Sequence, residues 1–149
     1  MALEKQIQED LKAAMFAKDA TALASIRGIK AAIMLAKTAA GASDELTDAD
    51  IIKIIQKLVK QRKESAAIYT EQSRPELAEA ELAEAAIMEK YLPVQLSEEE
   101  VEETIKKIIA QVGAKSPADM GKVMGVATKA LAGQADGRLI STIVKRLLS

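Results

Sequence analysis

Apolar residues recur with helical spacing along the chain, and this spacing predicts an all-α protein. The first stripe has one apolar residue at every fourth position: Leu3, Ile7, Leu11 and Met15. Later segments show the same kind of pattern, which is typical of helices that bury one face. No run alternates between apolar and polar residues as a strand would, and no repeat period is visible.

Four helices are predicted before Pro93. The second begins near Asp19 or Thr21 and ends before the loop TAAGASDE. Thr47 and Asp50 resemble a capping box that opens a long third helix. A proline in the first turn starts the fourth helix, and Pro93 stops it at the preceding residue. The second helix is expected to bury Leu23, Ile26, Ile29 and Ile33. The apolar residues of the third are Ile51, Ile54, Ile55, Leu58, Ile68 and Tyr69, and those of the fourth are Leu77, Leu82, Ala86, Ile87 and Leu92.

A second, smaller domain of three helices is predicted after the linker 93–96. Ser97 and Glu100 form a capping box, and Gly113 suits the C-terminal end of that helix. The stripe expected on it is Val101, Ile105, Ile108 and Val112, and the last helix is expected to bury Ile140, Ile143, Val144 and Leu147. The motif residues expected to shape this domain are Pro93, Asp119 as the N3 acid of the middle helix, Gly133 at its end, Asp136 as the cap of the last helix, and Gly137. The sequence therefore divides into an N-terminal four-helix bundle-like domain, 1–92, and a C-terminal domain, 97–149.

The composition gives little support to catalysis. The chain has no His and no Cys, and no nucleophile or phosphate-loop motif. Asp119 and Asp136 each precede a glycine within two residues, but both are best interpreted as acids at helix N-termini. The sequence predicts no catalytic residue, no metal and no cofactor. It also contains no apolar run of the roughly 20 residues that a membrane span needs, so a cytoplasmic location and no membrane partner are expected.

Two glycines inside the predicted middle helix of the second domain call for an explanation. Gly within a helix costs roughly 1 kcal/mol relative to Ala, yet Gly121 and Gly125 lie four residues apart in DMGKVMGVATKA. Lys122, Gly125 and Lys129 share one face, and Met120, Met124, Ala127 and Leu131 share another that is directed at the core. The first face would let an RNA phosphate backbone approach closely. Alternatively, the glycines permit close helix–helix packing, an explanation that spacing alone favours somewhat.

Further basic residues lie outside this helix. Arg138, Thr142 and Lys145 form a polar stripe on the last helix. A second candidate basic surface lies on the long third helix and comprises Lys53, Lys57, Lys60, Arg62 and Lys63, with no acid between them. Because aromatic residues make up only 2% of the chain, there are few platforms on which single-stranded bases could stack. RNA binding would therefore depend on the phosphates and shape of a folded RNA.

Four segments resemble the YqeY proteins in order and spacing: LVKQRKESAAIY, KYLPVQLSEEE, ADMGKVMG and GQADGRLISTIVKRLL. The last third also resembles the C-terminal tail domain of the B subunit of the tRNA-dependent amidotransferase. This resemblance implies a helical bundle joined to a small three-helix domain that helps to hold tRNA. It would place Lys122, Gly125, Lys129, Arg138 and Lys145 near RNA. The sequence departs from many relatives at Gln134, where a Lys is common, and at Ser73, where a Gly is common.

Three functional hypotheses follow. The leading one is a non-catalytic protein that binds tRNA or another folded RNA through the basic, glycine-bearing helical face of the C-terminal domain, with Gly121 and Gly125 permitting close approach. The second is a protein–protein adaptor that docks on a complex of tRNA aminoacylation or amidation. The third is an accessory of a glutamine-dependent tRNA amidotransferase, a carbon–nitrogen ligase, because the family is often labelled in this way. The catalytic centres of that enzyme lie in parts that the resemblance does not cover.

Overall fold

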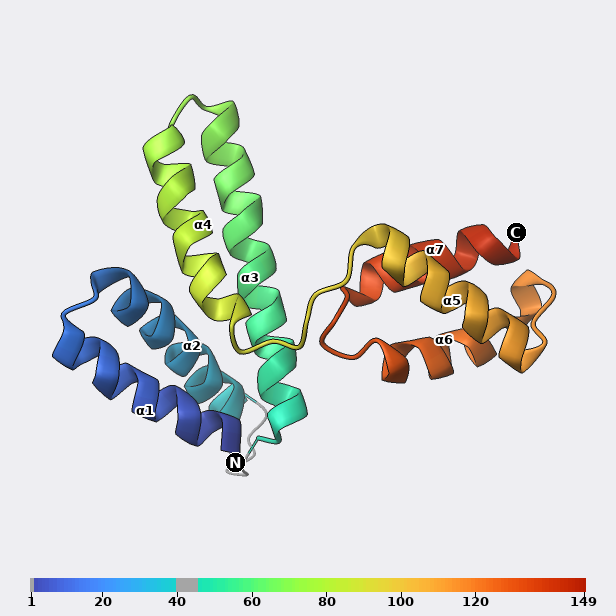
Figure 1. Ribbon diagram of the computed structural model, residues 1–149, viewed down its shortest axis with the longest axis horizontal. Helices are drawn as coiled ribbons and strands as arrows, with labels where there is room; N and C mark the ends of the chain where they lie inside the picture. The colour runs from blue at the N-terminus through green and yellow to red at the C-terminus, as the bar shows by residue number, and fades with distance from the viewer. Residues whose placement is uncertain (1, 40–45) are drawn as a thin grey trace. The chain divides into compact units, whose positions relative to one another are not determined.

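The computed structural model describes residues 2–39 and 46–149, and every regular element in this part of the chain is a helix (Figure 1). The elements are α1 (Ala2–Ala17), α2 (Ala20–Ala39), α3 (Asp48–Glu71), α4 (Pro75–Glu89), α5 (Glu98–Val112), the 3₁₀ turn η1 (Pro117–Asp119), α6 (Met120–Ala130) and α7 (Gly137–Leu148). The all-α prediction is confirmed. Most of the predicted loop TAAGASDE, residues 40–45, lies outside the described residues, whereas Thr38 and Ala39 belong to α2.

The chain forms two compact units, Met1–Leu92 and Pro93–Ser149. The segment 93–96 contains no regular structure, but its last two residues are hydrogen-bonded within the second unit. The Leu96 N–H donates to the Gln134 carbonyl at 3.0 Å, and the Gln95 side-chain amide donates to the Gly133 carbonyl at 2.6 Å. Half of the expected linker is therefore anchored to the unit that follows it.

The first unit is held together by aliphatic side chains from all four of its helices. Its buried cluster comprises Ile7, Ala14, Ile26, Ile29, Ile33, Ile51, Ile55, Val59, Ala85 and Met88. Burying such side chains supplies about 25 cal/mol for each Å² of apolar surface removed from water. A polar tie joins the two ends of the unit, because the Tyr91 hydroxyl donates to the Asp10 carboxylate of α1. Burial, and then the nearby Asp10 charge, raise the pKa of Tyr91, so the phenol stays a donor.

The predicted stripe on α1 is wrong in its last turn. Ile7 is buried, but Met15 is 54% exposed and Ala14 occupies the core position instead. A strict spacing of four residues advances about 40° around a helix at each step, because a residue accounts for about 100°. Met15 therefore lies well away from Leu3, whereas Ala14, seven residues after Ile7, returns to the same face.

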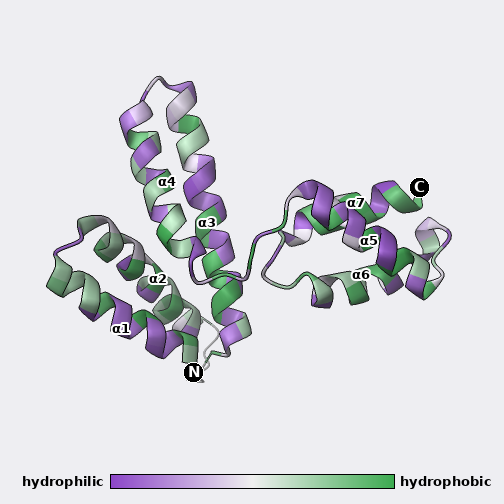
Figure 2. Ribbon diagram, viewed as in Figure 1, coloured by the Kyte–Doolittle hydropathy of each residue, from purple (hydrophilic) through white to green (hydrophobic). Residues whose placement is uncertain are grey.

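The apolar residues named for the fourth helix are not the ones that α4 buries most deeply. Leu77, Leu82 and Ala86 are exposed, and the residues buried in their place are Ala78, Ala85 and Met88. Apolar residues occur all around α4, so the sequence marks no single buried face (Figure 2). Small alanines let α4 lie close along α3, and this close packing turns the leucines outward. Ile68, named among the apolar residues of the third helix, is likewise 52% exposed.

The predicted caps at the start of α3 and at both ends of α5 are confirmed, whereas the middle helix of the second unit, α6, ends at Ala130 with Leu131 as its C-cap and not at Gly133. Thr47 and Asp50 exchange hydrogen bonds at the start of α3, and Ser97 and Glu100 do the same at the start of α5. Gly113 ends α5 with φ 69°, a left-handed conformation that favours glycine. The capping hydrogen bonds at Thr47 and Ser97 satisfy backbone N–H groups that a helix leaves without a partner in its first turn.

The three helices of the second unit enclose their own core. Its buried residues are Val101, Ile105, Ile108, Val123, Ala127, Leu131, Ala135, Ile140, Ile143, Val144 and Leu148. In the last helix, Leu148 takes the fully buried place expected for Leu147, which is partly buried. The Asp136 carboxylate accepts the Arg138 N–H at the start of α7, as expected of a cap.

Replacement of the α5 cap should destabilise the second unit. Ser97→Ala removes the hydroxyl that accepts the Glu100 N–H, and loss of such a cap costs about 1 kcal/mol. Ser116→Ala is a matched control, because the Ser116 side chain makes no capping hydrogen bond at the 3₁₀ turn. Urea unfolding followed by circular dichroism would measure both changes. Equal effects of the two substitutions would contradict the role given to Ser97.

Candidate nucleic-acid interface on helix α6

The orientation of α6 is fixed by its buried face. Val123 and Ala127 are completely buried, and Leu131, just past the end of the helix, is 1% exposed. The expected core face was only partly right: Ala127 and Leu131 are buried, Met120 and Met124 are partly buried, and Val123, at its centre, was missed. With this face against the core of the unit, the side of α6 that carries Lys122, Gly125 and Lys129 is exposed.

The exposed side of α6 forms a shallow, open depression. Its lining residues are Gly121, Lys122, Gly125, Val126, Lys129 and Ala130. A Cβ atom built at Gly121 or Gly125 would meet nothing within 4 Å. The alternative explanation, that these glycines allow close packing with another helix, finds no support within the second unit. Their effect is to leave the helix backbone uncovered beside Lys122 and between Lys122 and Lys129.

The electrostatics of this surface are positive. Helix α6 contains no acidic residue, and both of its lysines are exposed. Asp119 lies just before the helix, and its carboxylate accepts the Lys115 N–H at 2.9 Å. This hydrogen bond lowers the pKa of Asp119, and the Lys122 charge lowers it further. Lys129 makes no ion pair with any residue that the structure describes.

The basic residues of α7 do not line this depression. Arg138 and Lys145 are exposed on α7, and the Thr142 hydroxyl between them donates to the Arg138 carbonyl at 2.9 Å. Gly137 is the first residue of α7, and Gly133 is a buried turn residue with φ 76°. Arg138 and Lys145 thus form a stripe of their own, while Lys122, Gly125 and Lys129 share one surface with Gly121.

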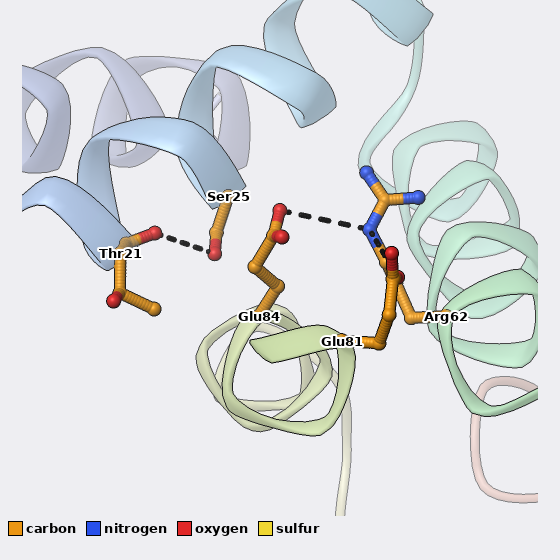
Figure 3. A network of polar contacts seen from close by, with 5 residues as sticks. All are labelled: Thr21, Ser25, Arg62, Glu81 and Glu84. Carbon is orange, nitrogen blue, oxygen red and sulfur yellow. Dashed lines mark hydrogen bonds and ion pairs between the residues drawn. The ribbon is translucent and has the colours of Figure 1, made fainter. Parts of the chain in front are cut away.

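The second candidate basic surface is divided by ion pairs. Lys53, Lys57 and Lys60 are exposed on α3. The Lys63 ammonium lies 2.6 Å from the Glu89 carboxylate of α4. The Arg62 Nε lies 3.7 Å from carboxylate oxygens of both Glu81 and Glu84, and these side chains are about one quarter exposed (Figure 3). Arg62 and Lys63 therefore join α3 to α4.

Helix α2 completes the surroundings of Arg62. A Cβ atom at Gly28 would lie 3.4 Å from an Arg62 terminal nitrogen and 3.7 Å from the Met88 methyl group. One turn before it, the buried Ser25 hydroxyl donates to the Thr21 carbonyl at 2.8 Å (Figure 3). The absence of a side chain at Gly28 thus makes room for a guanidinium between three helices. Sequence reasoning missed this arrangement.

Other kinds of site find no support in the described residues. No group of three or more acidic side chains is placed to hold a metal ion in residues 2–39 and 46–149. Within the same ranges, no helix is both long and apolar enough to cross a membrane. Among the arrangements described, the α6 surface agrees best with the RNA-binding face that the sequence predicts.

The family model described as Yqey-like protein matches residues 4–148. The chain belongs to this family. Relatives include the fungal protein named "Altered inheritance of mitochondria protein 41, mitochondrial". In Meyerozyma guilliermondii it is 35% identical over 124 residues, covering 80% of this chain and 64% of that protein. In Pyrenophora tritici-repentis it is 30% identical over 149 residues, covering 96% and 79%.

A third relative is a subunit of the glutamyl-tRNA(Gln) amidotransferase from Thermococcus gammatolerans. It is 45% identical over 76 residues, which cover 48% of this chain and 11% of that protein. The expected resemblance to a protein of tRNA-dependent amidation is thus found. The matched share of this chain is larger than the unit Pro93–Ser149, so the similarity extends beyond that unit. The chain spans 64% and 66% of the first two fungal relatives' length.

Gly125→Ala should stabilise the protein. Gly125 lies in the interior of α6, and the added methyl group would meet open space. Ala is the better helix former, so the free energy of unfolding should rise by roughly 0.5–1 kcal/mol, as measured by urea unfolding. Gly113→Ala is the matched opposite case, because a left-handed φ of 69° makes any side chain unfavourable there. A loss of stability in Gly125→Ala would mean that a close contact exists at this position.

Arg62→Ala should destabilise the first unit. Without the guanidinium, the partly buried carboxylates of Glu81 and Glu84 face each other with no cation between them. A partly buried charge that loses its partner costs roughly 1–3 kcal/mol. Lys53→Ala removes an exposed cation from the same helix and should change the free energy of unfolding by less than about 0.5 kcal/mol. Similar unfolding midpoints for the two variants would contradict a structural role for Arg62.

Proposed function

We propose that this protein binds a folded RNA, and tRNA in particular, through the α6 surface defined by Gly121, Lys122, Gly125 and Lys129. The observation that carries the proposal is the open backbone at both glycines, of which Gly121 precedes Lys122 and Gly125 lies between Lys122 and Lys129, on a helix without acids. Packing within the second unit does not explain why glycine stands at these two positions. Close approach of a flat, negatively charged ligand to the helix backbone would explain it.

The arrangement suits phosphate contacts. Lys122 and Lys129 are seven residues apart, or about 10 Å along the helix axis, so each would meet a different phosphate group. Gly125 lies between them and offers no side chain to hold the RNA backbone away. Lysine is a flexible point charge, so it can follow a phosphate without demanding one base sequence. We expect binding that depends on the charge and shape of the RNA.

Similarity to part of a glutamyl-tRNA(Gln) amidotransferase supports tRNA as the RNA class. The same similarity supports a second candidate function, namely that of an accessory to an amidation complex. A rise in glutamine-dependent transamidation when this chain is added to such an enzyme would favour that function. A cytoplasmic location remains an expectation from the sequence, whereas the names of the fungal relatives say "mitochondrial" of those proteins.

The test is binding of the full chain to total tRNA over a series of salt concentrations. Affinity should fall as salt rises, with a log–log slope of roughly 0.7 to 0.9 for each phosphate contact. The double variant Lys122→Glu, Lys129→Glu should lose at least about tenfold in affinity and show a slope smaller by roughly two contacts. Circular dichroism should be unchanged, because both side chains are exposed.

The matched control changes the charge of the other basic surface by the same amount. Lys53→Glu with Lys57→Glu alters two exposed lysines on α3 and should weaken tRNA binding much less. The α6 site would be wrong if the α3 variant lost affinity and the α6 variant kept it. Absence of binding by the wild-type chain at low salt would contradict the RNA-binding function itself.

A further inference from the structure

Helix α4 carries an unusual set of charges. It has five glutamates and no basic residue. Three of them pair with α3: Glu81 and Glu84 with Arg62, and Glu89 with Lys63. The other two, Glu76 and Glu79, are exposed and make no ion pair with any residue in the described part of the chain. Glu76 lies in the first turn, where the helix dipole favours an acid, but Glu79 lies beyond it.

One of the exposed acids, Glu79, belongs to a row of residues whose other members are small or apolar. Pro75, Glu79, Leu82 and Ala86 have the spacing of one helix face, and all four are exposed. Leu82, at the centre of this row, is 49% exposed. The row lies beside the buried face of α4, because Leu82 follows Ala78 by four residues and precedes Ala85 by three; Ala78, Ala85 and Met88 are buried. Figure 1 shows this part of α4 in the portion of the α3–α4 hairpin that projects beyond α1 and α2.

A broad apolar stripe on a helix is normally buried across its whole width. In α4, the part of the stripe at Ala78, Ala85 and Met88 is buried within the unit, whereas the adjoining part at Leu82 and Ala86 is exposed. Ala83 and Ala86 add little relief beside Leu82, so another helix can approach to the 8–10 Å at which helices pack. The row therefore has the shape of a helix-docking surface, and its chemistry is acidic at one end and apolar at the other.

We propose that the surface formed by Pro75, Glu79, Leu82 and Ala86 docks an amphipathic helix of a partner protein that carries apolar residues flanked by lysine or arginine. An apolar side chain of the partner packs against Leu82, and its cations lie opposite Glu76 and Glu79. Nucleic acid is excluded by the two carboxylates. A second copy of the same face is disfavoured, because it would bring these carboxylates toward one another. The surface lies in the first unit, and the proposal is independent of RNA binding by α6.

The experiment measures fluorescence anisotropy of labelled helical peptides with the full chain. One peptide, of about five helical turns, has a Leu and Ala face flanked by lysines, and the control peptide has glutamates in place of the lysines. The wild-type chain should bind the lysine peptide at least about tenfold more tightly. The double variant Glu76→Lys, Glu79→Lys should bind the glutamate peptide more tightly than the lysine peptide. It tests charge recognition because it changes the charges and leaves Leu82 in place.

Leu82→Gln tests the apolar part of the surface. It should weaken binding of the lysine peptide about tenfold, as loss of a central interface residue does. Met34→Gln is the matched control, because Met34 is 68% exposed on α2, outside the proposed surface, and should leave the affinity unchanged. Thermal melting of each variant checks that the chain is folded.

Three results would overturn the proposal. Equal affinity of the wild-type chain for both peptides would show that Glu76 and Glu79 select nothing. An equal loss of affinity in Met34→Gln and Leu82→Gln would show that the peptide binds without a defined site. A dimer in sedimentation that Leu82→Gln converts to a monomer would identify a second copy as the occupant.

Discussion

Burial of aliphatic side chains on one face of each helix is the constraint on which the other features depend. With few aromatic residues, each core must be filled by Ile, Val, Leu, Met and Ala, and a helix can satisfy this demand with only part of its surface. On α6 and just past its end, the buried residues are Val123, Ala127 and Leu131. Because these residues face the core, Lys122, Gly125 and Lys129 on the other side of the helix are exposed to solvent. The candidate interface is thus a consequence of packing on the opposite side of the same helix.

Both ends of α6 are tied by hydrogen bonds, which helps a short helix to tolerate interior glycine. Before it, the Asp119 carboxylate closes the turn by accepting the Lys115 N–H. After it, the Gly133 and Gln134 carbonyls accept hydrogen bonds from the segment that enters the unit. Isolated helices of this length are marginal, and glycine weakens them further. Tertiary packing and these hydrogen bonds therefore offset the low helix propensity of Gly121 and Gly125.

Local rules predicted the helices, most of their caps and the exposed side of α6, because each depends on residues within a few positions of one another; the core face of α6 was predicted only in part. A capping box needs four residues, and the Lys122–Lys129 face needs less than three turns. Arg62 was assigned to a basic surface, although its environment is set by Glu81 and Glu84 on the next helix and by Gly28 on an earlier one. The same long-range packing decides which side of α4 is buried. Whether Gly121 and Gly125 packed against a neighbour also required the positions of the other helices.

The two exposed surfaces differ in sign, and this difference limits what each can bind. Phosphate groups are attracted to α6 and repelled by Glu76 and Glu79, whereas a basic helix experiences the opposite forces. If both proposals hold, an RNA and a basic protein partner would not compete for one site. Added salt would weaken both proposed contacts, but RNA binding would decline more steeply, because each phosphate contact releases condensed counterions. Salt dependence would therefore distinguish the two proposed modes of binding.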